Sequence, residues 1–170
     1  MIFVLGLVIL GLHAGMSYMA ARSNAGNSKI QHQDTVAVFA AHTACNAFMK
    51  ALIMLPSGVP CEKIQWRLTL LQDAEGVKRY QATCIYGMQE NSAPGFVGGG
   101  QMVQQQAKWL IEKGTATNAN AVVYKLYNEA QNTAILLEKM DDNILHFLYS
   151  DRHLLIGNAS WGYTLNRMHN

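Results

Sequence analysis

Charged residues are scarce in this chain, because Asp, Glu, Lys and Arg make up only 14% of its 170 residues and leave a formal net charge of +2. No dense stripe of Lys and Arg is present, which excludes the usual nucleic-acid-binding classes. Half of the residues are hydrophobic, whereas disordered chains combine low hydrophobicity with high net charge. The sequence contains only one long apolar run, which excludes a membrane protein with several transmembrane helices. The composition therefore predicts one folded domain.

The single apolar run comprises residues 2–12 at the start of the sequence. A helix that crosses a bilayer needs about 20 apolar residues, but His13, Gly15 and Ser17 interrupt this stretch. Its length fits the hydrophobic region of a secretory signal, and small residues suited to cleavage occur at 21–25. Residues 1–25 are therefore predicted to be a signal peptide or an uncleaved N-terminal anchor, with a buried helix as a third interpretation. We expect export to the periplasm or cell envelope, and membrane contact only through this segment if it is uncleaved.

A polar spacer and the start of a helical cap are predicted over residues 26–41. Segment 36–55 is rich in Ala, Met and Leu and lacks turn residues, a pattern that favours one or two helical turns over a strand. Pro56, Gly58 and Pro60 then end the helix. A single β-barrel domain is expected over residues 42–168.

After Cys61, hydrophobic and polar side chains alternate, which is the period-2 pattern of a strand with one face in water. Turn-forming Gly, Asn and Asp residues separate the alternating runs. The expected strands are 64–70, 80–86, 101–111, 121–127, 134–139, 144–149, 153–156 and 161–167. About eight short strands with no helix between them predict an all-β, antiparallel, up-and-down sheet, and closing it into a barrel removes the exposed edges.

Three cysteines are present, and their odd number leaves the pairing open. Cys45 and Cys61 bracket the predicted helical cap, and an oxidising compartment favours a disulfide between them. Closing a loop of this size stabilises the fold by about 3 kcal/mol through restriction of the unfolded chain. Cys84 shares the apolar face of its predicted strand, so we expect a buried free thiol.

A metal site is the alternative interpretation of the same region. His42, Cys45 and Met49 are spaced at i, i+3 and i+7, so a helix would present all three on one face. Imidazole, thiolate and thioether together suit Cu(I). A disulfide would remove the thiolate, and methionine in an Ala/Leu/Met segment is usually packing material. We therefore expect no cofactor, with Cu(I) as the one candidate metal.

Large aromatic side chains follow the predicted alternation. Trp66, Trp109 and Trp161 are expected to point into the barrel, with Tyr163 and His146 beside them. One interpretation is core filling, because eight-stranded barrels are just wide enough to be filled by side chains. The other is an aromatic cup for a small hydrophobic ligand. We favour core filling, because a domain of this size needs these rings in its core.

Catalytic candidates are few. Residues 141–143 (Asp-Asp-Asn) look like an acidic cluster, but they lie between two predicted strands, where such residues form turns. His146 with Asp142 is the remaining acid–base pair, and a lone inward histidine is more often a hydrogen-bonded core residue. The glycine-rich segment 95–100 lacks the Lys-Ser/Thr of a phosphate-binding loop. The sequence therefore favours a protein that is not an enzyme.

The C-terminal region carries a more specific pattern, hydrophobic–Gly–Asn–x–x–Trp–x–Tyr–Thr–Leu–x–Arg, which ends at Arg167. Together with CEKIQWRLTLLQD and the YGM…GFVGGG segment, it resembles the N-terminal domain of NlpE-type envelope proteins, in particular short single-domain members of the Bacteroidetes type. The resemblance covers residues 42–167. It implies a lipocalin-like barrel in the envelope with a role in copper homeostasis or envelope-stress sensing.

Two features depart from that family. No cysteine follows the apolar run to accept a lipid, and the Cys-x-x-Cys pair of better-known members is absent. Copper chemistry is therefore not transferred by motif. The resemblance implies an envelope signalling protein as partner, and the alternative function is a lipocalin-like carrier of a small hydrophobic ligand inside the barrel.

Overall fold

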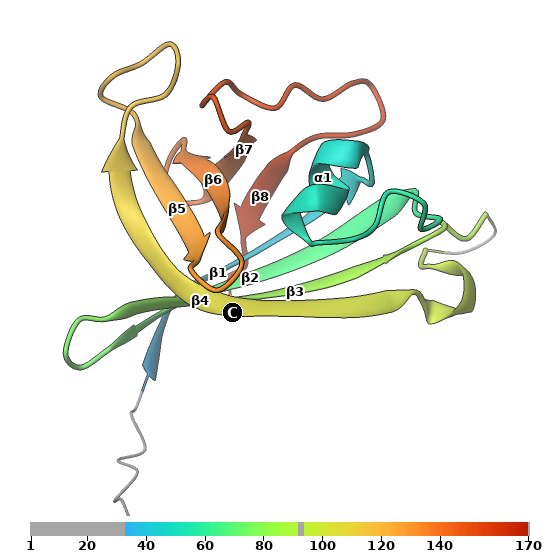
Figure 1. Ribbon diagram of the computed structural model, residues 1–170, viewed down its shortest axis with the longest axis horizontal. Coiled ribbons are helices and arrows are strands. Elements are labelled where there is room, and N and C mark those ends of the chain that lie inside the picture. The colour runs from blue at the N-terminus through green and yellow to red at the C-terminus, as the bar shows by residue number, and fades with distance from the viewer. Residues whose placement is uncertain (1–32, 92–93, 170) are drawn as a thin grey trace, which may run out of the picture. The chain divides into compact units, whose positions relative to one another are not determined.

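A computed structural model describes residues 33–91 and 94–169 of the chain, so the predicted signal peptide or anchor at 1–25 lies outside the described residues. Each strand pairs antiparallel with the next along the chain, and the last pairs with the first to close a barrel (Figure 1). This confirms the predicted all-β barrel of eight strands. The elements are β1 (Gln33–Ala44), α1 (Ala47–Leu52), β2 (Lys63–Asp73), β3 (Lys78–Gly87), η1 (Val97–Gly99), β4 (Gln101–Lys113), β5 (Val122–Asn128), β6 (Thr133–Lys139), β7 (Ile144–Leu148) and β8 (Thr164–Arg167).

The first strand occupies residues that the sequence pattern assigned to the spacer and the helical cap. β1 pairs with β2 from Gln33↔Asp73 to Ala44↔Lys63, so the helix predicted over 36–55 is wrong for residues 36–44. The barrel accordingly starts before residue 42. Small alanines permit either structure, and the long β2 strand supplies backbone partners that a local pattern does not reveal.

The helix that does form, α1, has six residues. The side chain of Asn46 accepts a hydrogen bond from the Met49 amide at 2.9 Å and caps its N-terminus. Neither α1 nor the three-residue η1 is long enough to cross a membrane, and no other helix occurs in the described part of the chain.

The C-terminal end of the barrel also differs from the prediction. Residues 153–156 form no strand, because only a single bridge joins Leu148 to Leu154. The predicted strand 161–167 is shortened to β8, so a long connection runs over residues 149–163. The number of strands nevertheless matches the prediction, because β1 takes the place of the missing one.

The barrel interior is filled by side chains. Trp66 and Trp109 are 2% and 3% exposed, and the Trp66 ring packs against Phe147 with 5.1 Å between centroids. The space among the inward side chains at the centre holds no water-sized cavity. Burial of each such aromatic or aliphatic group contributes about 1.5–3 kcal/mol. The side chains around this point are Trp66, Leu68, Ala82, Leu126, Ile135, Leu137, Phe147 and Leu165.

The predicted disulfide is confirmed. Cys45, just after β1, is bonded to Cys61, just before β2, and their Cα atoms are 5.6 Å apart. The bond therefore closes the loop that contains α1. Met49 of the helix and Ile53, which follows its last residue, are buried in the barrel core, and the Leu52 carbonyl accepts a hydrogen bond from Gln105 of β4 at 2.9 Å.

Candidate binding groove at the β1–β8 seam

The barrel closes through a short seam. β1 pairs with β8 at two positions, Phe39↔Arg167 and Ala40↔Asn166, and the Met168 amide adds a hydrogen bond to the Val38 carbonyl at 2.8 Å. By contrast, the other edge of β1 pairs with β2 along its whole length. The β1–β8 seam is therefore the shortest ladder of the barrel wall, with β7–β8 next at three paired positions.

An open groove of about 440 Å³ lies where the two strands separate. Its walls come from β1, from its neighbour β2 and from β8 with the residue that precedes Tyr163. We call it the seam groove. It is lined by Ala40, Ala41, His42, Gln65, Trp66, Gly162, Thr164 and Asn166.

Main-chain groups of β1 and β8 face the seam groove. The Met168 amide donates to the Val38 carbonyl across the seam. In an antiparallel ladder every second residue points its amide and carbonyl toward the same neighbour, so Ala40 and His42 of β1 and Asn166 and Thr164 of β8 also point theirs across the seam. Ala40 is paired with Asn166, but His42 and Thr164 are not paired with each other. Both strands thus offer main-chain donors and acceptors to whatever occupies the groove.

Trp66 of β2 lies at the inner side of the groove. Its indole nitrogen donates to the hydroxyl of Thr43 at 3.0 Å, and both residues are buried. The polar atom of this tryptophan is therefore already satisfied, and its ring belongs to the barrel core. His42 and Gln65 lie opposite one another on β1 and β2 with exposed side chains at the rim.

His146 does not point into the barrel as predicted. Leu145 and Phe147, both 0% exposed, take the inward positions of β7, so His146 lies on the outer face. Its Nε2 donates to the Leu155 carbonyl at 3.0 Å, and its Nδ1 forms a hydrogen bond with Thr164 Oγ1 at 3.1 Å. This histidine holds the groove residue Thr164 in place.

The predicted acid–base pair of His146 and Asp142 is not formed. Both ring nitrogens of His146 have the partners just described, and the carboxylate of Asp142 pairs with Lys139 at 2.6 Å. The hydrogen bond and the positive charge of Lys139 lower the pKa of Asp142. Residues 141–143 form the turn between β6 and β7, in agreement with the turn interpretation.

Trp161 is another correction, because it does not fill the core. It is half-buried in the connection before β8, whereas Tyr163 is buried and its hydroxyl accepts a hydrogen bond from Asn46 at 2.8 Å. The Asn158 side chain accepts from the amides of Ser160 and Trp161. The Gly-Asn-x-x-Trp pattern is therefore a tight turn that leads into the groove wall.

Glycine is required at the start of that turn. A Cβ atom on Gly157 would lie 2.1 Å from the carbonyl oxygen of Trp161. By contrast, Gly162 in the groove wall has no atom within 4 Å of such a position. The sequence alone gave no means to tell these two glycines apart, since both occur in the same pattern.

The predicted copper ligands are not brought together. Cys45 is in a disulfide, so it offers no thiolate. His42 is exposed on β1, whereas Met49 is fully buried on α1, because a strand replaces the helix that would have aligned them. Within residues 33–91 and 94–169, no group of three His, Cys, Asp or Glu side chains is arranged to hold a metal.

The third cysteine is a free thiol in the core, as predicted. Cys84 is 1% exposed, and burial raises its pKa well above the ordinary value. Burial also raises the pKa of Tyr80. A neutral, inaccessible thiol is a poor nucleophile and a poor metal ligand.

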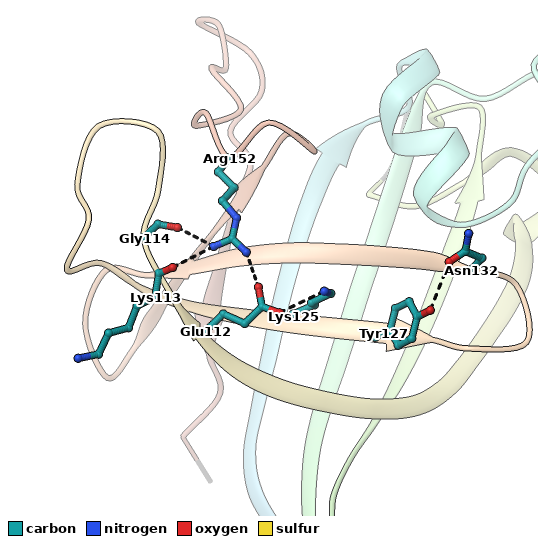
Figure 2. A network of polar contacts seen from close by, with 7 residues as sticks. All are labelled: Glu112, Lys113, Gly114, Lys125, Tyr127, Asn132 and Arg152. Carbon is teal, nitrogen blue, oxygen red and sulfur yellow. Dashed lines mark hydrogen bonds and ion pairs between the residues drawn. The ribbon is translucent and has the colours of Figure 1, made fainter.

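A polar network fixes the connection after β7 to the end of β4 (Figure 2). The guanidinium of Arg152 donates to the carbonyls of Lys113 and Gly114 at 3.1 and 2.7 Å and to the carboxylate of Glu112. Lys125 of β5 donates to the same carboxylate at 3.1 Å. Partial burial alone would raise the pKa of Glu112, but hydrogen bonds and charge from Lys125 and Arg152 outweigh it and lower the pKa.

Glu112→Gln is expected to reduce the free energy of unfolding by about 1 kcal/mol at neutral pH. Because the folded-state pKa of Glu112 is lowered, its ionised form adds stability above the unfolded-state pKa, and this is lost as the pH falls through the folded-state pKa. Urea unfolding at a series of pH values should therefore show the two proteins converge in acid.

The matched control is Glu129→Gln, which removes an exposed pair with Lys108 at 3.4 Å. Such surface pairs contribute little, so this variant should remain close to the unchanged protein at every pH. A Glu112→Gln deficit that stays constant into acid would contradict the role given to the ionised carboxylate.

No family model, curated protein or solved structure matches this chain. The NlpE-type resemblance of the C-terminal pattern thus stays a prediction from the sequence. The interpretation of the seam groove therefore depends on its own residues. There, β1 and β8 stop pairing next to Trp66, whose indole nitrogen already has a hydrogen-bond partner.

Proposed function

We propose that this is an exported, non-enzymatic envelope protein that works by binding an extended segment of another envelope polypeptide in the seam groove. The observation that carries the proposal is the early end of β1–β8 pairing, which leaves main-chain groups of His42 and Thr164 facing the groove. Main-chain pairing with an added strand is a recurrent mode of peptide recognition. In this proposal the protein serves envelope-stress sensing or copper homeostasis, the role that the NlpE-type resemblance implies.

The Cys45–Cys61 disulfide supports export, because such bonds persist in oxidising compartments. The charge around the groove favours a partner segment with an acidic side chain. None of the lining residues is a carboxylate, and Arg67 is exposed on β2 opposite Ala40.

A carrier function inside the barrel is less well supported, because the central space holds no water-sized cavity. A hydrophobic ligand would have to displace core side chains such as Phe147. Copper handling through His42, Cys45 and Met49 is not proposed, since these side chains do not converge. A role in copper homeostasis would therefore act through the bound partner.

Gly162→Trp provides the test, because the groove has open space where its side chain would begin. The full chain would carry a photoreactive residue at His42 and be cross-linked in living cells, with adducts located by mass spectrometry. We expect an adduct to an extended segment of an envelope protein, reduced about tenfold or more by Gly162→Trp, a loss of at least 1.4 kcal/mol in binding.

The matched control is Gly58→Trp, another glycine with no atom near the added Cβ and with no place in the groove lining. This variant should give as much adduct as the unchanged chain. An adduct that Gly162→Trp leaves intact, or none at all from His42, would refute the proposed site.

A further inference from the structure

Part of β4 is an open sheet edge. β4 pairs with β3 from Gln101 to Lys108, but with β5 only from Lys108 to Lys113. In the described part of the chain, no strand lies along the other edge from Gln101 to Ala107. Figure 1 shows this half of β4 as the lower border of the sheet, beyond the point where β5 meets it.

This edge lacks the features that normally prevent strand addition. Natural edges carry lysine, proline or a bulge, whereas residues 101–107 (QMVQQQA) include neither a charge nor a proline. The β3–β4 register runs through this half without a shift. Met102 is also 59% exposed, although methionine is an apolar residue.

The open edge is held in place from inside. Gln105 is 8% exposed, and its side-chain amide donates to the Leu52 carbonyl of α1 at 2.9 Å. The disulfide-closed loop that contains α1 therefore braces the middle of this segment. A strand that is already ordered loses little further conformational entropy when another strand pairs with it.

We propose that the Gln101–Ala107 edge pairs with the same edge of a second copy of this chain. When identical antiparallel strands are related by a two-fold axis, the residue on the axis faces its own symmetry mate, and residues equally far on either side of it face each other. Centring the axis on Gln104 pairs all seven residues and sets Met102 opposite Gln106. A charge at the axis position, or like charges at two symmetric positions, would oppose this pairing, because like charges directly opposite are destabilising.

The absence of charge over residues 101–107 thus favours a second copy over a partner recognised by charge. The nearest charge, Lys108, falls opposite Gly100 in this register and meets no other lysine. The interface continues the sheet from β3 and β4 of one copy into β4 and β3 of the other. It is independent of the seam groove, since the two share no lining residue.

Cysteine cross-linking tests the proposal on the full chain expressed in the bacterial envelope. Opposite residues of antiparallel strands have Cα atoms about 4.5–5.5 Å apart, within the range that a disulfide spans. Gln104→Cys is therefore expected to give a band at twice the monomer mass on a non-reducing gel. Background should be low, because Cys84 is buried and the other two cysteines are paired.

Gln81→Cys is the matched control, since Gln81 is exposed but lies on β3, inside the sheet. The double variant Met102→Cys, Gln106→Cys sets each new cysteine opposite one of the second copy in this register, so it should also give the dimer band. Adding Gln104→Lys to that double variant sets two lysines opposite each other at the axis and should abolish the band while circular dichroism stays unchanged. Dimer yields from Gln104→Cys and from Met102→Cys, Gln106→Cys no higher than from Gln81→Cys, or a band that survives Gln104→Lys, would overturn the proposal.

Discussion

Replacing Phe147 with alanine is expected to lower the free energy of unfolding by about 3–5 kcal/mol, the range measured for large aromatic truncations in well-packed cores. Phe147 is 0% exposed, and its ring packs against Trp66 at the centre of the barrel. The side chains around it leave no water-sized space, so removal of the ring would create a cavity in a well-packed core. Urea unfolding of the full chain in mild detergent, followed by tryptophan fluorescence, measures the change.

Tyr149→Ala is the control for this variant, because Tyr149 is an aromatic residue with 39% exposure that follows the same strand. Its ring packs against Phe48 with 4.9 Å between centroids, so its removal should cost about 1–2 kcal/mol, clearly less than that of Phe147. A similarly small cost for Phe147→Ala would mean that the barrel interior is adaptable, and it would restore the carrier of a hydrophobic ligand as the better function.

The second large effect is expected from loss of the Cys45–Cys61 disulfide. The double variant Cys45→Ser, Cys61→Ser should be less stable by about 3 kcal/mol, because the bond closes a loop with a sequence separation of 16 and restricts the unfolded chain. Urea unfolding with and without a reductant measures this effect. The reductant should shift the unfolding midpoint of the unchanged protein but not that of the double variant.

Cys84→Ala controls for the chemistry of the reductant, since this thiol is buried and unpaired. Its midpoint should still fall when reductant is added. The disulfide also fixes the end of the strand that forms one wall of the seam groove, because Cys45 follows β1 and comes three residues after His42. Adduct formation from His42 should therefore fall in the double variant, and a midpoint insensitive to reductant would contradict this account.

Much of the barrel could be predicted because its strands are amphipathic. Along β2, Ile64, Trp66 and Leu68 are buried and alternate with more exposed polar residues. The local pattern therefore already predicts which face of the strand packs against the core. The disulfide was predictable for a similar reason, since it closes a local loop in an exported chain. Trp66 and Trp109 were placed correctly inside the barrel by the same alternation.

The errors occur where distant partners decide the outcome. Residues 36–44 have a helix-compatible composition, but β2 offers them a full set of backbone hydrogen bonds. The alternation of β7 did not decide which face of the strand carries His146. Its side chain lies on the outer face because Leu145 and Phe147 occupy the inward positions. Trp161 belongs to a turn whose Gly157 permits a backbone approach that no side chain would allow.

The sequence by itself determined the composition of this protein's core, its alternating strands and its disulfide, because each depends on neighbours along the chain. The seam groove and the open edge of β4 were decided by the tertiary structure. Both arise from unequal strand lengths: β8 has four residues against twelve in β1, and β5 has seven against thirteen in β4. The longer strand in each pair is left with main-chain groups that no local pattern could have shown to be unpaired.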